Sequence, residues 1–136
     1  LYLVDVGLLA AMTDLDAKTL LMGNAIFTEF KGALTEQYIC QQLYAELDMV
    51  PYYWSAEASS GEVDFVLQYR GQVVPLEVKA EENLNAKSLK SFVNTYQLAY
   101  GVRTSMSDYR EQEKLVNLPL YAISLLWEVC DKMNEA

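Results

Sequence analysis

The chain has 136 residues, of which 52% are hydrophobic, so we expect a single domain with its own core over residues 1–136. Its net charge of −9 opposes generic binding of nucleic acid, because that affinity comes mainly from lysine and arginine neutralising phosphates. Histidine is absent, which excludes catalytic triads with an imidazole base and HExxH zinc sites. Any catalysis must therefore use carboxylates, lysine or a metal ion.

The opening segment, LYLVDVGLLAAM, is apolar and fits either a strand or a helix. It lacks a basic leader and contains Asp5, so it makes a poor signal peptide, and no later apolar stretch is long enough to span a bilayer. We therefore expect a cytoplasmic protein with no membrane partner. Because the chain begins at Leu1 rather than at methionine, we also expect it to be a fragment of a longer protein.

Helical and strand patterns alternate after a polar stretch at residues 13–25. The long helix is predicted over residues 28–47, with Thr28 as its N-cap and no interior proline. Aromatic and β-branched residues then predict strands near 52–56, at 62–69 and at 72–80. The remaining pattern predicts, in order, a helix over 85–99, a strand near 100–105, a polar loop, and an apolar final segment over 115–130.

The two central strands predict a β-hairpin whose loop is centred on Arg70 and Gly71. In the first strand alternation gives a core face, which consists of Val63, Phe65, Leu67 and Tyr69. A symmetric loop places Tyr69 opposite Gln72, Asp64 opposite Glu77 and Glu62 opposite Lys79. Like charges directly opposite each other destabilise a sheet, which favours a divalent cation between them; a solvated face neutralised by Lys79 is the alternative.

The long helix adds a third carboxylate. At 100° per residue its apolar stripe consists of Ile39, Cys40, Leu43 and Leu47, and Glu36 falls in the middle of that stripe. A carboxylate aimed at the core needs a partner. The partner is either Lys79 in a salt bridge or a metal ion that the hairpin acids also bind, and both place Glu36 beside the hairpin.

These residues resemble the pattern of the PD-(D/E)xK nuclease superfamily, in which a helix carries a Glu, one strand an Asp, and the next strand (D/E)xK. Here the elements read Glu36, Asp64 and Glu77-Val78-Lys79. The superfamily's proline before the Asp is replaced by Val63. More narrowly, the segments LYLVDVGLL, YYWSAEASSGEVDFVL, VVPLEVKA, GVRTS and NLPLYAI resemble the domain of unknown function that follows an AAA+-type ATPase module in many bacterial and archaeal proteins.

The resemblance implies an α/β fold with a restriction-endonuclease-like core, a mixed central sheet flanked by helices. It implies that Asp64, Glu77 and the Val78 carbonyl hold Mg²⁺ or Mn²⁺, and that Lys79 orients or helps to deprotonate the attacking water. Glu36 would bind or orient a second metal ion or its water. The reaction implied is hydrolysis of phosphodiester bonds in DNA or RNA.

A second interpretation has no catalysis. In it the domain is a regulatory or protein-interaction element of an ATPase module in the same chain, which the acidic charge and the YYW and LLW clusters favour. The sequence leaves the oligomeric state open. Convergence of the four polar residues favours the enzyme, and a large exposed apolar patch elsewhere favours the interaction module.

Overall fold

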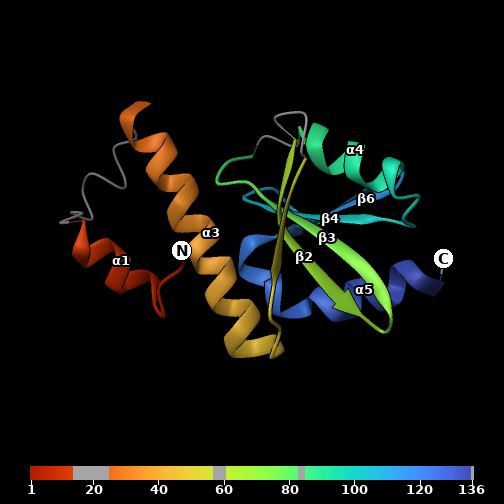
Figure 1. The fold of residues 1–136 in the computed structure, drawn as a ribbon, viewed down its shortest axis with the longest axis horizontal. Coiled ribbons are helices and arrows are strands. Elements are labelled where there is room, and N and C mark those ends of the chain that lie inside the picture. The colour runs from red at the N-terminus through yellow and green to blue at the C-terminus, as the bar shows by residue number, and fades with distance from the viewer. Residues whose placement is uncertain (14–24, 57–60, 83–84, 136) are drawn as a thin grey trace.

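The computed structural model describes residues 1–13, 25–56, 61–82 and 85–135. A six-stranded mixed sheet of order β1-β2-β3-β4-β6-β5 forms its centre, with helices on both sides (Figure 1). The strands are β1 (Tyr52–Ser55), β2 (Glu62–Tyr69), β3 (Gln72–Val78), β4 (Gly101–Ser105), β5 (Arg110–Gln112) and β6 (Leu115–Pro119). The described helices are α1 (Val6–Met12), α3 (Ala25–Leu47), α4 (Lys87–Thr95), the 3-10 helix η1 (Leu120–Leu125) and α5 (Leu126–Glu135). The predicted α/β class, a mixed sheet flanked by helices, is confirmed.

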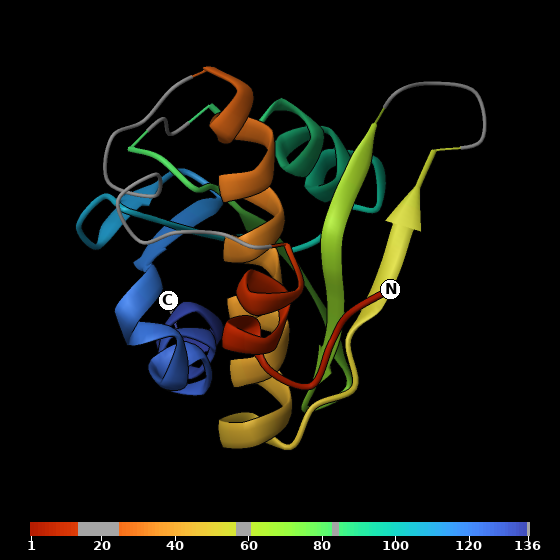
Figure 2. The same ribbon diagram turned by 90° about the vertical axis from the view of Figure 1, so that its left-hand side faces the viewer.

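The sheet changes direction at its centre. Strands β1, β2 and β3 form an antiparallel meander, β3, β4 and β6 are parallel, and β5 returns antiparallel on β6. Helix α4 makes the crossover from β3 to β4. Helix α1 packs on α3 at the end of the molecule away from α4 and α5 (Figure 1). Figure 2 looks onto this end, with α1 in front of α3.

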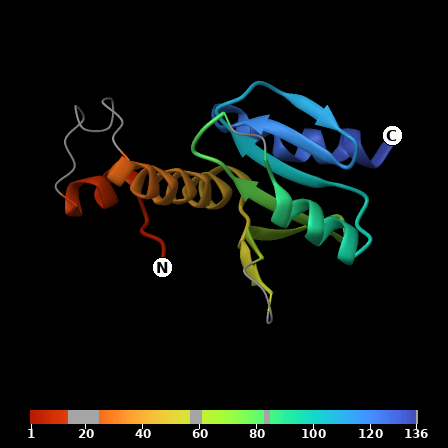
Figure 3. The same ribbon diagram turned by 90° about the horizontal axis from the view of Figure 1, so that it is seen from above.

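Two buried clusters hold the helices on the sheet. The larger one joins α3, η1 and α5 to one face, and its fully buried members include Ile39, Leu43, Leu67, Leu76 and Ile123. The smaller one lies under α4 on the opposite face and consists of Val63, Ala86, Leu89, Phe92 and Val93. Figure 3 shows α4 and α5 on opposite sides of the sheet. The predicted stripe on α3 is confirmed, because three of its four members are buried and the fourth, Leu47, packs against this core.

The hairpin register is confirmed over the five residue pairs from Tyr69–Gln72 to Phe65–Leu76. The loop is the predicted two-residue turn, with φ of 48° at Arg70 and 80° at Gly71. Positive φ at both central residues is the requirement of a type I′ turn, whose twist matches that of the flanking strands. Glycine adopts this conformation without steric cost.

Gly71→Ala is therefore expected to destabilise the protein by about 1 kcal/mol, because alanine pays a steric cost at positive φ that glycine does not. Nothing lies within 4 Å of the added methyl group, so the effect is one of backbone conformation alone. Urea denaturation of both proteins measures it. Gly32→Ala is the matched control, since that glycine lies inside helix α3 and also has open space around it. Alanine there should instead stabilise.

The predicted alternation of side chains between the two faces of the sheet is wrong at the start of β2, where Val63 does not share the face of Phe65 and Leu67. Phe65 and Leu67 belong to the larger core, whereas Val63 lies under α4 on the opposite face. The cause is a register shift against β1, where Tyr52 pairs with Val66 but Trp54 pairs with Val63, which inserts one extra residue into β2. Such a bulge reverses the faces of the residues that precede it.

Several predicted boundaries also differ. Helix α3 begins at Ala25, so Thr28 is not an N-cap; residues 25–27 include no proline or glycine that would stop the helix. Helix α4 ends at Thr95 because Gln97 has a φ of 52°, and the amides of Gln97 and Leu98 bond back to Asn94 and Val93 in a Schellman motif. Strand β5 lies in the predicted polar loop. Most of the polar stretch at 13–25 lies outside the described residues.

Candidate functional site

Asp64 lies where the β2–β3 ladder ends. Its Oδ2 accepts a hydrogen bond of 2.7 Å from the backbone N–H of Val78, two residues beyond Leu76, the last β3 residue that pairs with β2. Because the N–H and C=O of one strand residue point to the same edge, the Val78 carbonyl also faces β2. The amide of Lys79, by contrast, donates to Thr104 on β4. The Asp64 carboxylate thus accepts the hydrogen bond that a backbone carbonyl of β2 would otherwise accept from Val78. Its other oxygen, Oδ1, is available to a further ligand.

Glu77 and Lys79 form an ion pair at the end of β3. Glu77 Oε1 lies 2.6 Å from Lys79 Nζ, and the Glu77 side chain is only 8% exposed. The other oxygen, Oε2, is buried and has no hydrogen-bond partner among the described residues. Burying a carboxylate oxygen without a partner costs free energy. A cation or a hydrogen-bond donor beside Oε2 would remove that cost.

Glu36 lies half-buried on α3, with its carboxylate 3.5 Å from the hydroxyl of Tyr2. Tyr2 is positioned by its neighbour Leu3, whose amide donates to Gln37 Oε1 at 2.8 Å and whose carbonyl accepts from Gln37 Nε2 at 2.6 Å. The Tyr2 ring also packs on Phe65 of β2, at 5.7 Å between centroids. The N-terminal segment therefore lies between α3 and the sheet, beside the acids.

Sequence reasoning missed Tyr2 and Gln37. The one signal for Gln37 is its place on α3 beside the apolar stripe, where it is 2% exposed. A buried glutamine in a helix needs backbone or side-chain partners, and here these are the backbone groups of Leu3 in the N-terminal segment. For Tyr2 the sequence offers no signal, because its neighbours come from residues far along the chain.

The electrostatics show that the acids affect one another. Burial raises the pKa of Asp64 to about 6, and the charges of Glu36 and Glu77 add to the effect, while the Val78 hydrogen bond and Lys79 oppose it. Burial also raises the pKa of Glu36, with Tyr2 and Lys79 opposing. The other three predicted residues, Glu36, Glu77 and Lys79, thus lie within electrostatic reach of Asp64. Three carboxylates therefore outnumber the two cations that interact with them, Lys79 and the buried Arg103 opposite Glu77.

The arrangement fits one divalent cation with few protein ligands. In the described part of the chain no three Asp, Glu or Cys side chains gather closely enough to bind an ion by themselves. Mg²⁺, however, is usually held by one or two carboxylates and keeps several waters. Asp64 and Glu77 would give such an ion two carboxylates and Val78 a carbonyl, and this predicted ligand set stays a prediction. Glu36 does not join them in a three-carboxylate cage, so its predicted role at a second ion or its water stays a prediction.

Residues 31–123 match the sequence family described as domain of unknown function DUF4143. The chain belongs to this family. The matched range contains Glu36, Asp64, Glu77 and Lys79, whereas Tyr2 precedes it. None of the curated proteins matches the chain. The predicted membership in a family of unknown function is confirmed, and the relation to PD-(D/E)xK nucleases and to an AAA+-type ATPase module stays a prediction.

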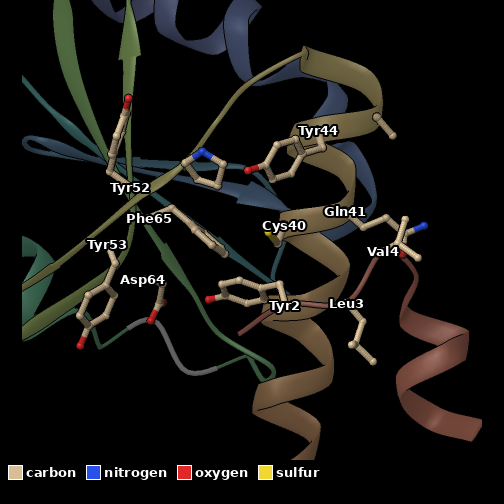
Figure 4. A pocket seen from close by; sticks show the side chains of 12 residues that line it. Tyr2, Leu3, Val4, Cys40, Gln41, Tyr44, Tyr52, Tyr53, Asp64 and Phe65 are labelled. Carbon is tan, nitrogen blue, oxygen red and sulfur yellow. The ribbon is translucent and has the colours of Figure 1, made fainter. Parts of the chain in front are cut away.

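This DUF4143 domain also has an aromatic pocket of about 710 Å³ beside Asp64. Figure 4 shows its side chains, with Tyr2 and Cys40 on one side and Asp64 and Phe65 on the other. Tyr44, Tyr52 and Tyr53 line it as well, and all three are exposed. The β2 bulge explains why two consecutive residues, Asp64 and Phe65, both line one pocket.

None of the described helices combines the length and apolar character that crossing a membrane requires.

Proposed function

We propose that the domain hydrolyses phosphodiester bonds of DNA or RNA with Mg²⁺ or Mn²⁺. The observation that carries the proposal is the unpartnered Oε2 of Glu77, buried beside Lys79 and next to the strand end where Asp64 bonds Val78. An excess of three carboxylates over the two cations near them, Lys79 and Arg103, favours a missing cation. The resemblance of Glu36, Asp64 and Glu77-Val78-Lys79 to the nuclease pattern supports the same reaction.

Each residue has a role that follows from its position. Asp64 and Glu77, with the Val78 carbonyl, would hold the ion, which when bound supplies Lewis-acid polarisation of the phosphate and acidifies a bound water. The Val78 N–H fixes the direction of the Asp64 carboxylate. Glu77 fixes Lys79, whose side chain is 36% exposed, so a substrate phosphate could reach it. Lys79 would orient the attacking water and stabilise negative charge on the phosphate oxygens.

We extend the proposal to the setting of the domain. The resemblance supports a place after an AAA+-type ATPase module in the same chain of a cytoplasmic prokaryotic protein. The ATPase would then control when the nuclease domain meets its substrate. The oligomeric state would follow from that module.

Cleavage of labelled oligonucleotides tests the proposed reaction. We expect single- or double-stranded DNA or RNA to be cut in the presence of millimolar Mg²⁺ or Mn²⁺ and to remain intact with EDTA, because the site holds too little positive charge without an ion. Restoring the metal after chelation should restore the cut. Cleavage that survives EDTA would contradict the proposed chemistry.

The aromatic pocket favours a second candidate, a protein-interaction domain without catalysis. Its exposed tyrosines, Tyr44, Tyr52 and Tyr53, are residues typical of interface cores. The same face carries Asp64, so a partner bound there would cover the acids. Absence of metal-dependent cleavage and of metal-dependent stabilisation would leave this candidate as the better one.

A further inference from the structure

A pocket on the α4 side of the sheet gathers positive charge in a chain that is acidic overall. Its volume is about 420 Å³, and it contains four of the chain's ten lysine and arginine residues. These four are Lys87, Lys90, Arg103 and Lys114. Glu113 is the one acid that lines it, in a chain with 19 acidic residues. This basic pocket therefore has the opposite charge to the molecule as a whole.

Arg103 forms the inner wall of the basic pocket. It is 1% exposed, and it donates to Asn117 Oδ1 at 3.0 Å and to Gln112 Oε1 at 3.4 Å, which fix the guanidinium. In the parallel ladder Arg103 lies directly opposite Glu77. The basic pocket thus adjoins the candidate metal site along the sheet.

The lysines are placed at the rim. Lys87 is exposed in the first turn of α4 and makes no ion pair with a described residue. Lys90 pairs with Glu113 at 3.2 Å, but both side chains are more than half exposed, and exposed pairs hold together weakly. Lys114 Nζ reaches only the carbonyl of Leu98, at 3.5 Å. All three ammonium groups are accessible to an anion.

We propose that the basic pocket binds a backbone phosphate of a nucleic-acid strand whose neighbouring phosphodiester lies at the Asp64–Glu77 site. That the ligand is a nucleic-acid strand rests on the proposed function. That the pocket binds a phosphate group rests on the charge of its lining alone. A concave site with cations at its rim and side-chain amides from Asn94 and Gln112 suits a tetrahedral oxyanion. The local positive charge also explains how so acidic a chain would bind a polyanion.

Fluorescence anisotropy with a labelled oligonucleotide, in EDTA and in the Asp64→Asn background, tests this binding apart from cleavage. In the double variant Lys87→Gln/Lys114→Gln we expect binding to weaken about tenfold at low salt. The slope of log Kd against log salt should decrease by about 1.4 for a single strand or about 1.8 for a duplex, since each lysine neutralises one phosphate. Lys87→Arg/Lys114→Arg should retain the wild-type affinity.

Lys31→Gln/Lys132→Gln is the matched control, because it removes the same charge from two exposed lysines outside the basic pocket. It should change affinity less than about twofold, and thermal unfolding should show all variants folded. Equal effects of the two double variants, or no oligonucleotide binding at all, would overturn the proposal. Full competition by millimolar inorganic phosphate or a mononucleotide would overturn the assignment to a strand. If the wild type binds the oligonucleotide but does not cleave it with Mg²⁺ or Mn²⁺, that result would instead count against the proposed hydrolysis alone.

Discussion

Asp64→Asn is expected to abolish metal-dependent cleavage and metal binding while making the metal-free protein more stable. Asparagine keeps an oxygen that accepts from the Val78 N–H, but it removes a charge that Glu36 and Glu77 repel. With a folded pKa of about 6 against an ordinary 3.8, ionising Asp64 at pH 7 costs up to roughly 3 kcal/mol of folding free energy. The variant avoids that cost.

The stability difference between the wild type and Asp64→Asn should depend on pH. Because burial raises the pKa of Asp64, its contribution to stability is fully present below pH 3.8 and is lost as the pH rises through about 6. The stability advantage of Asp64→Asn should therefore be small near pH 4, grow between pH 4 and about 6, and level off above that range. Thermal unfolding of both proteins in EDTA across this range measures it.

Metal should stabilise the wild type and have no effect on the variant. Mn²⁺ at ten times its dissociation constant would stabilise the wild type by about 1.4 kcal/mol and leave Asp64→Asn unchanged. Asp108→Asn, the same substitution at an exposed aspartate, is the control and should respond to metal like the wild type. If Asp64 served only as a partner of Lys79, Asp64→Asn would destabilise the protein, and neither protein would respond to Mn²⁺.

Lys79→Met is expected to destabilise the metal-free protein by about 2 to 4 kcal/mol, because it leaves the buried Glu77 carboxylate with neither oxygen paired. The partial exposure of Lys79 keeps the cost below that of a fully buried pair. Since the ammonium would also stabilise charge on the phosphate, cleavage should decrease by roughly 10²- to 10³-fold. Urea denaturation and single-turnover cleavage measure the two effects.

Two further variants separate charge from packing. Glu77→Gln added to Lys79→Met removes the unpaired charge, so most of the lost stability should return while cleavage stays low. Lys132→Met breaks an exposed ion pair with Glu111 and should cost little stability, because solvent screens exposed pairs. A loss in Lys79→Met no larger than in Lys132→Met would show that Glu77 gains little from its lysine.

Local sequence patterns predicted the hairpin and its register correctly. The Arg70-Gly71 pair supplies the two positive φ angles of the turn, and the turn then determines which residues face each other from Tyr69 to Phe65. The stripe on α3 was predictable for a similar reason, since its period of 3.6 residues depends only on the helix. Both features arise from neighbours in sequence. The sequence alone therefore determined the strands that carry Asp64 and Glu77.

The tertiary structure decided which groups surround those acids. The bulge that turns Asp64 toward α3 arises from pairing with β1, and the Tyr2 contact arises from two hydrogen bonds between Leu3 and Gln37. Strand β5 has three exposed polar residues and is held by backbone bonds to β6, so no apolar period marks it. Likewise the basic pocket combines lysines from α4 and from the β5–β6 turn that have no common period. These features depend on contacts between distant segments, and such contacts form only when the sheet assembles.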